Sequence, residues 1–345
     1  PADHAIKLRL AEVLGEIGFA DAARTYLTEL LKRNGKDKVA LAALARLEYH
    51  ENRWDAASAI YRRLLPLEEG DALVEVALKL ADACEQGDRL ADARSGLERA
   101  LKACPASMAV RMRLHEVYEK TGAHGALAQL ILEDAAKESD VSGRFGLLLT
   151  AARFLLGQEG DPVQAAQVLE QARTLRPEDD EGVLLLSRAY AAQNRTGDAV
   201  TLLQTTLGQR KGRRSKQLSA MHREISRIHL KDGEVVAALE SLTKAFEMDL
   251  HNGETALELG LMAKDLDQQE LASRAFRAVT FMKAAVPGST DGASPTAKGL
   301  SYYYLAQMAK DVGDLRKARL LAQKAVMEDP NLEAAKALLE ELKSA

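Results

Sequence analysis

The sequence contains few aromatic residues and no long apolar run. Aromatic side chains make up 4% of its 345 residues, with a single tryptophan, and most of its apolar residues are alanine and leucine. A β-rich fold relies on aromatic and β-branched residues, so this composition favours helices that pack closely through small side chains. No stretch reaches the ~18 consecutive apolar residues that a membrane-spanning helix needs. We therefore expect an all-α chain without a membrane span.

Cysteine is almost absent, and charge of neither sign dominates. Cys84 and Cys104 form no CxxC pair and fit a reduced, cytoplasmic protein. With 47 basic and 51 acidic residues, the formal net charge is −4, which gives no general attraction to nucleic acid or anionic membranes. The chain begins at Pro1 without methionine or a signal segment, so we expect a segment of a longer protein.

Motifs for catalysis or metal binding are missing as well. No GxSxG or HExxH sequence occurs, and the stretch "GSTDGASPTAKG" lacks the glycine before Lys298 that a phosphate-binding loop requires. His222 and His229 lie seven residues apart on one expected helix face, without a third ligand nearby in the sequence, so we interpret them as packing residues. We expect no enzyme, no metal site and no cofactor.

A small residue, replaced once by leucine, recurs after a turn at nine places along the chain. Four of the eight spacings between successive positions are 34 residues, and the other four are longer. The nine positions are Ala23, Ala57, Ala93, Leu127, Ala165, Ala199, Ala238, Ala272 and Ala318. A second apolar stripe at helical spacing precedes each turn, so each unit is expected to be two antiparallel helices that must stack on neighbouring units to bury their apolar faces.

These units resemble the tetratricopeptide (TPR) family, whose pattern is W-x2-L-G-x2-Y, A-x3-F and a final proline on a 34-residue period. Leu259 and Gly260 match its first helix, and Ala272 and Phe276 match its second. The first-position tryptophan is missing, and Asn52 and Asn194 replace the glycine of the tight turn. The resemblance implies a right-handed α-solenoid over residues 1–345 that binds other proteins. The expected repeats are 4–37, 38–73, 74–107, 108–142, 143–179, 180–214, 215–252, 253–287 and 295–330, with a capping helix at 331–344.

In this family the first helices of the repeats line a concave groove that binds peptides or partner helices. Projecting first-helix residues away from the packing stripe selects a set of arginines and apolar side chains. The candidate partner-binding residues are Arg46, Tyr49, Met112, Arg113, Phe154, Arg188, Arg223, Arg227, Leu257, Tyr303 and Tyr304. Arginines beside apolar sockets suit an acidic or amphipathic peptide or helix. The partner's identity and the oligomeric state stay open.

A basic stretch, "GQRKGRRSK", falls between the sixth and seventh repeats. Its cations are Arg210, Lys211, Arg213, Arg214 and Lys216, and Gly208 and Gly212 are expected to interrupt any helix there. We interpret it as a solvated linker that could extend the positive end of the groove. An alternative function is nucleic-acid binding through residues 209–231, although the stretch has no aromatic residue to stack on a base. A second alternative is a peptide- or signal-sensing TPR regulator.

Overall fold

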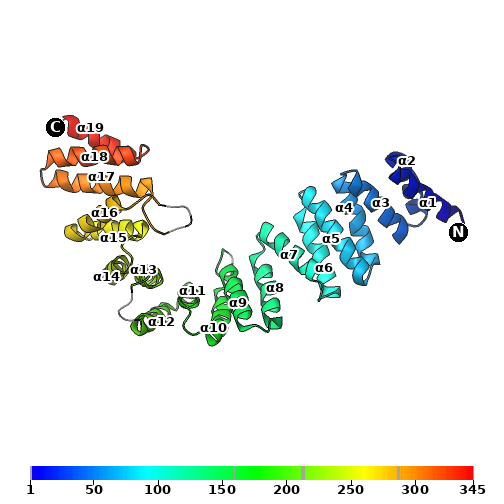
Figure 1. Cartoon of the computed structure of the whole chain (residues 1–345), viewed down its shortest axis with the longest axis horizontal. Helices are drawn as coiled ribbons and strands as arrows, with labels where there is room; N and C mark the ends of the chain where they lie inside the picture. Colours follow the sequence, from blue (N-terminus) through cyan, green and yellow to red (C-terminus); the bar gives the residue numbers. More distant parts are fainter. Residues whose placement is uncertain (1, 159, 211–213, 286–287, 289, 345) are drawn as a thin grey trace. The chain divides into compact units, whose positions relative to one another are not determined.

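In the computed structural model of the chain, the described residues are 2–158, 160–210, 214–285, 288 and 290–344. These residues form nineteen α-helices and one 3₁₀ turn, and no strand (Figure 1). The helices group into two compact units, unit 1 (Pro1–Gly160) and unit 2 (Asp161–Ala345). The boundary lies within the expected repeat 143–179. The fold is an all-α helical repeat solenoid, as the sequence predicted, whereas its division into nine repeats stays a prediction.

Unit 1 consists of four helix pairs followed by one further helix, and Figure 1 shows α3 to α6 side by side. The first helices are α1 (Ala2–Glu16), α3 (Lys38–His50), α5 (Gly70–Gln86), α7 (Met108–Lys120) and α9 (Val141–Leu155). The second helices are α2 (Ala20–Arg33), α4 (Trp54–Leu64), α6 (Leu90–Ala103) and α8 (His124–Lys137), and η1 (Leu65–Leu67) follows α4.

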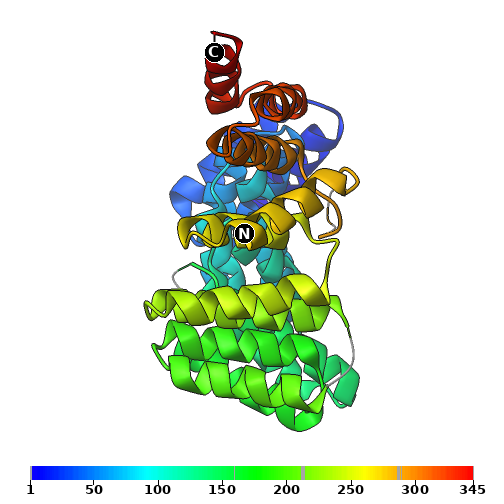
Figure 2. The same ribbon diagram turned by 90° about the vertical axis from the view of Figure 1, so that its left-hand side faces the viewer.

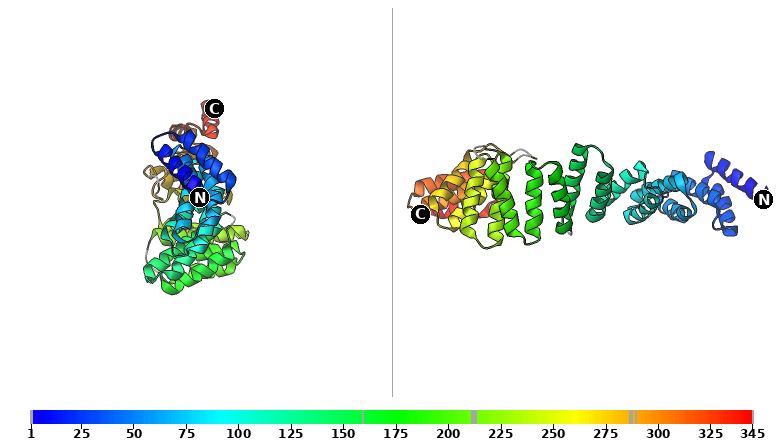
Figure 3. Two further views of the ribbon diagram at one scale, coloured as in Figure 1. Left: turned by 90° about the vertical axis from the view of Figure 1, so that its right-hand side faces the viewer. Right: turned by 90° about the horizontal axis from the view of Figure 1, so that it is seen from below.

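Unit 2 begins with one helix, continues with four pairs and ends with a last single helix. Figure 2 shows the helices around α11 to α14 in layers, and Figure 3 (right) shows α11 to α16 next to one another. The first helices are α11 (Asp180–Ala192), α13 (Lys216–Lys231), α15 (Gly253–Asp265) and α17 (Pro295–Asp311). The other helices are α10 (Pro162–Leu175), α12 (Thr196–Gln209), α14 (Val235–Met248), α16 (Gln269–Phe281), α18 (Leu315–Glu328) and α19 (Glu333–Ser344).

Short polar turns join the helices of each pair. Asn52 and Asn194 have positive φ angles of 57° and 60°, as their turn-forming character predicted. Asparagine tolerates this left-handed backbone better than most residues do, so it can replace glycine there. Most first helices then begin at a side chain that accepts hydrogen bonds from the first turn. These caps are Asp37, Ser107, Asp140, Asp179, Ser215, Asn252 and Ser294.

The core is distributed along the stack of helices. All nine recurring positions are buried, and the eight alanines among them have no exposed surface. Their small side chains let the backbones of neighbouring helices come close. At the C-terminus, Leu338 and Leu342 of α19 are buried, whereas Lys336 and Glu340 face solvent. A polar outer side is what a capping helix requires, and the role of α19 as a cap stays a prediction.

The insertion after α12 and the insertion after α16 both contain more regular structure than the sequence predicted. Helix α12 continues to Gln209, so the prediction that Gly208 would interrupt it was wrong. A glycine in the last turn of a helix costs only about 1 kcal/mol, and the rest of α12 supplies more. In the insertion after α16, the Ala293 N–H donates a hydrogen bond to the Lys283 carbonyl (2.9 Å), and the Gly253 N–H donates one to the Gly292 carbonyl (3.0 Å). The described part of this insertion is therefore fastened to the start of α15.

Candidate partner-binding surface

The eleven predicted binding residues all lie on first helices, and each keeps some exposed surface. Five belong to unit 1 and six to unit 2. We call the exposed and half-buried side of the first helices the first-helix face, and describe it for each unit separately. The structure shows which of these side chains already have partners within the chain.

In unit 1, two of the predicted aromatic residues take part in packing. Tyr49 meets Trp54 edge to face at 5.2 Å between ring centroids, and the Lys79 Nζ atom lies 5.0 Å from the centroid of the Tyr49 ring. Phe154 stacks on His124 at 5.7 Å. These rings join neighbouring helices, and both residues are half-buried, so only part of each remains available to a partner.

Arg113 in unit 1 is surrounded by acids. Its guanidinium forms ion pairs with Asp82 (3.2 Å) and Glu85 on α5 and with Glu116 (2.6 Å) on its own helix. Hydrogen bonds from Lys120 and Arg113 hold the pKa of the Glu85 carboxyl below its usual value. Acids outnumber cations in this cluster, so Arg113 is not available to an acidic partner.

Met112 and Arg46 are the most accessible predicted residues of unit 1. Met112 is 62% exposed although it is apolar. Arg46 has no ion-pair partner among the described residues, and its Nε donates a long hydrogen bond to the carbonyl of Ala42 (3.4 Å). It lines a hollow of about 560 Å³ between α1 and α3, and the other charged side chains that line this hollow include Arg9, Glu12, Glu16 and Glu51. The mixed charge of this hollow gives it no clear preference for an acidic ligand.

In unit 2, Arg223 is also neutralised within the chain. It pairs with Glu258 (2.5 Å) and Glu254 (3.3 Å), both on α15, and its side chain is 17% exposed. The hydrogen bond with Glu258 raises the pKa of the Arg223 guanidinium. This arginine ties α13 to α15.

Arg188 and Arg227 differ from Arg113 and Arg223, because these two arginines share a single carboxylate. The Oε2 atom of Glu224 accepts from Arg188 Nε at 3.1 Å and lies 3.7 Å from Arg227 Nη1. Glu224 is buried, whereas the two arginine side chains are 43% and 53% exposed. One positive charge therefore remains uncompensated at this point of the first-helix face. Sequence reasoning missed Glu224; its place three residues before Arg227 on α13 was the available signal.

The apolar residues predicted on the first-helix face of unit 2 lie half-buried against its core. Tyr304 stacks on Phe276 with ring centroids 5.2 Å apart, and Tyr303 meets Tyr304 edge to face at 5.1 Å. Leu257 packs against the same core cluster. Gln307 donates a hydrogen bond to the Tyr303 hydroxyl (2.7 Å), which fixes the direction of that side chain.

The basic stretch has acidic partners where the structure describes it. Arg210 pairs with Glu178 (3.4 Å) and Asp180 (3.5 Å), and Lys216 pairs with Asp291 (2.6 Å). Lys211 and Arg213 lie outside the described residues. Arg214 is exposed and has no ion pair with any described residue.

The described residues contain no cluster of three histidine, cysteine or acidic side chains placed to hold a metal ion. His229 Nδ1 lies 2.6 Å from Glu234, and Ser226 donates to the carbonyl of Ala238 (2.8 Å). Within the same residues, no helix combines the length and apolar character of a membrane span.

A scaffold of stacked helix pairs is typical of the general class of protein-interaction repeats. Two family models described as tetratricopeptide repeat match residues 8–72 and 156–221. These segments of the chain therefore carry tetratricopeptide repeats, in agreement with the predicted resemblance. Such repeats are generally non-catalytic scaffolds.

Solved structures with the same kind of fold have low sequence identity to this chain. One, described as Naa15/Naa10 bound to HypK-THB, is 15% identical with a TM-score of 0.50, and the match covers 99% of this chain and 61% of that one. The chain thus spans less than two thirds of that protein. The yeast Tom70 (14% identity, TM-score 0.38, covering 99% and 80%) and YrrB, described as a TPR protein with an unusual peptide-binding site (17%, 0.38, covering 55% and 89%), also match. Comparison with curated protein sequences finds no match.

Proposed function

We propose that this chain is a non-catalytic, cytoplasmic scaffold that binds an acidic, amphipathic segment of another protein along the first-helix face of unit 2. The observation that carries this proposal is the sharing of Glu224 by Arg188 and Arg227. Two half-exposed guanidinium groups face a single buried carboxylate, so a second carboxylate is needed to balance their charge. A partner's aspartate or glutamate can supply it through charge-assisted hydrogen bonds.

Half-buried apolar side chains also lie on the first helices of unit 2. Leu184 lies one turn before Arg188 on α11 and is half-buried against the core of unit 2, and Leu257 occupies a similar position on α15. An amphipathic helix places acidic and apolar residues three or four positions apart, which is the spacing needed to meet an arginine and a leucine one helical turn apart. The face therefore suits an acidic helix better than a purely charged tail.

The test compares a double charge reversal with a matched control. Arg188→Glu with Arg227→Glu removes the cationic point, whereas Arg173→Glu with Lys244→Glu makes the same charge change on exposed residues of α10 and α14. Partners that co-purify with the chain from its own cells are identified and quantified by mass spectrometry. We expect the first variant to reduce recovery of an acidic partner about tenfold and the control to leave it unchanged. Equal recovery with all three proteins, at unchanged helicity, would refute the proposal.

Nucleic-acid binding through residues 209–231 has less support. Arg210, Lys216 and Arg223 each pair with a carboxylate, so they offer little uncompensated charge to phosphates. A mobility shift with single-stranded RNA or DNA at low salt would favour that alternative. No described feature favours the signal-sensing alternative over a constitutive scaffold.

A further inference from the structure

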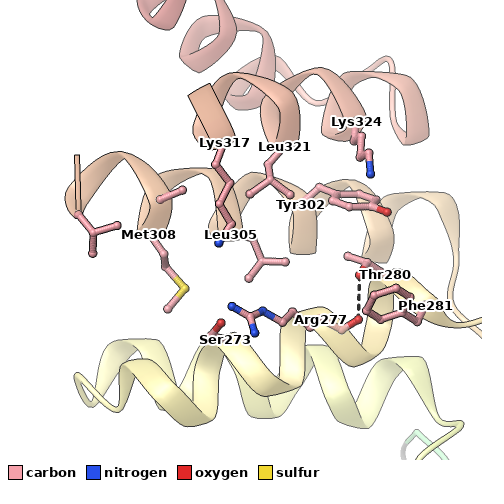
Figure 4. A pocket seen from close by; sticks show the side chains of 12 residues that line it. Ser273, Arg277, Thr280, Phe281, Tyr302, Leu305, Met308, Lys317, Leu321 and Lys324 are labelled. Atoms are coloured by element: carbon pink, nitrogen blue, oxygen red, sulfur yellow. Dashed lines mark hydrogen bonds between the residues drawn. The ribbon is translucent and has the colours of Figure 1, made fainter. Parts of the chain in front are cut away.

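A second hollow, of about 680 Å³, lies on the other side of unit 2, between α16, α17 and α18 (Figure 4). Its walls come from α16 and α18, which are the second helices of two successive pairs, and its floor comes from α17. None of the eleven predicted binding residues lines it. The hollow, which we call the second-helix groove, is therefore separate from the first-helix face.

The second-helix groove exposes large apolar side chains. Phe281 at the end of α16 is 86% exposed, and Val312 just after α17 is 80% exposed. Tyr302, Met308 and Leu321 are half-buried along the floor and the far wall. An isolated exposed apolar residue is ordinary, but several around one concave hollow are typical of a binding site.

The charges in the groove all have one sign. Arg277, Lys317 and Lys324 line it, and no aspartate or glutamate does. None of the three forms an ion pair with any residue in the described part of the chain; Lys324 only lies over the Tyr302 ring, with its Nζ atom 5.6 Å from the centroid. By contrast Arg274, one turn before Arg277, pairs with Glu247 at 3.7 Å. The groove therefore has three positive charges that the described residues leave uncompensated.

These side chains are ordered along the groove. Figure 4 shows Phe281, Tyr302 and Lys324 at one end, Met308 and Lys317 toward the other. Arg277 lies between the two ends (Figure 4). From Ser273 to Phe281 the wall of α16 extends for about 12 Å, which equals slightly more than two helical turns. Each end offers one apolar socket beside one cation.

We propose that the second-helix groove binds a short, acidic, amphipathic helix of another protein. Two apolar side chains about two turns apart, roughly seven residues, would enter the aromatic and the aliphatic end. Acidic residues beside them would pair with Lys324, Arg277 and Lys317. Charge complementarity is the reason for this assignment: three cations without acids around an apolar hollow match a ligand that is apolar and negative at once.

The experiment selects ligands without presupposing their composition. A display library of random helical peptides of about 16 residues is selected against the whole chain, and enriched peptides are measured by fluorescence anisotropy. Arg277→Glu with Lys324→Glu tests the charge, and Phe281→Ser tests the aromatic socket at an exposed position. Arg99→Glu with Lys102→Glu on α6 is the matched charge control, and Arg188→Glu with Arg227→Glu tests the first-helix face. The methyl resonance of Met308, assigned with Met308→Leu, reports the occupied surface, and that of Met112 serves as the reference.

Peptides with an excess of aspartate and glutamate and two apolar residues about seven positions apart are expected. Their affinity should fall about tenfold with the Arg277/Lys324 reversal and with Phe281→Ser, and stay unchanged with the control and the Arg188/Arg227 reversal. The Met308 methyl resonance should shift and that of Met112 should not. The proposal is overturned if no enriched peptide depends on Arg277 and Lys324, if basic peptides bind equally well, or if only the Arg188/Arg227 reversal weakens binding. It is also overturned if the groove instead mediates self-association, seen as a concentration-dependent mass that the Arg277/Lys324 reversal abolishes, or binds anionic vesicles in preference to the peptides.

Discussion

Replacing Gly260 with alanine should destabilise unit 2, although alanine is the better helix former. Gly260 is buried in α15, and a Cβ atom placed there would lie 2.5 Å from Cε1 and 2.6 Å from Cδ1 of Phe276. The Phe276 ring has no exposed surface and stacks on Tyr304, so it has little room to move. Overpacking of this kind costs about 1–3 kcal/mol, and alanine regains at most about 1 kcal/mol of helix propensity. We expect a net loss of up to about 2 kcal/mol.

Gly197→Ala is the matched control, because Gly197 is also helical and in unit 2 but has no atom within 4 Å of the added Cβ. It should leave stability unchanged or raise it by up to about 1 kcal/mol. Urea unfolding followed by circular dichroism gives the two differences, and hydrogen exchange should show faster exchange of α15 and α16 amides in Gly260→Ala alone. A Gly260→Ala protein as stable as Gly197→Ala would refute the close approach of α15 to Phe276. In the double variant Gly260→Ala/Phe276→Leu, the added methyl group should partly fill the space left by the ring, so the two costs should not add.

Two further predictions concern titration. Burial raises the pKa of the Cys84 thiol to about 11, whereas Cys104 is only half-buried. A thiol reagent at about pH 8 should therefore modify Cys104 first and Cys84 only on unfolding. Equal rates of modification at the two thiols would contradict this prediction. Burial, with a smaller effect from Lys244, lowers the pKa of His222 below 6.5. The unfolded chain then binds the proton more readily, so stability should fall as the pH drops below about 6.5, and His222→Gln should flatten that decline in unfolding experiments. An identical pH profile for His222→Gln would show that other groups cause it.

The fold could be predicted because its determinants are local. Ala199 and Ala238 are buried because each follows a turn at the same place in its helix, which periodicity alone reveals. The left-handed Asn52 and Asn194 follow from turn chemistry in the same way. The prediction was wrong at Gly208, where a local rule about glycine gave way to the rest of α12.

The binding surface could be predicted only in part. The exposure of a side chain follows from its position within its own helix, whereas its ion-pair partners can lie on other helices. Helical periodicity correctly selects first-helix residues that keep some surface, and Arg113 and Arg188 are equally good choices by that criterion. Their partners lie on other helices: Asp82 is 31 positions from Arg113, and Glu224 is 36 positions from Arg188. A one-repeat separation places two residues near each other, but their rotamers decide whether they pair. The second-helix groove was missed for a related reason, because it is assembled from three helices that no single motif connects.

The ratio of acids to cations at each point of the surface determines where an acidic segment can bind. A partner carboxylate that approaches Arg113 must compete with three carboxylates already within the chain and is repelled by those it does not replace. At Arg188 and Arg227 it meets one carboxylate shared between two cations, and in the second-helix groove it meets none. The attraction for a partner carboxylate should therefore increase from Arg113 to the Arg188/Arg227 pair and from there to the second-helix groove. This holds although the chain as a whole has a net charge of −4. An acidic partner is thereby directed to unit 2 by charges that the chain itself leaves uncompensated, and the arginine count alone would not have distinguished these three places.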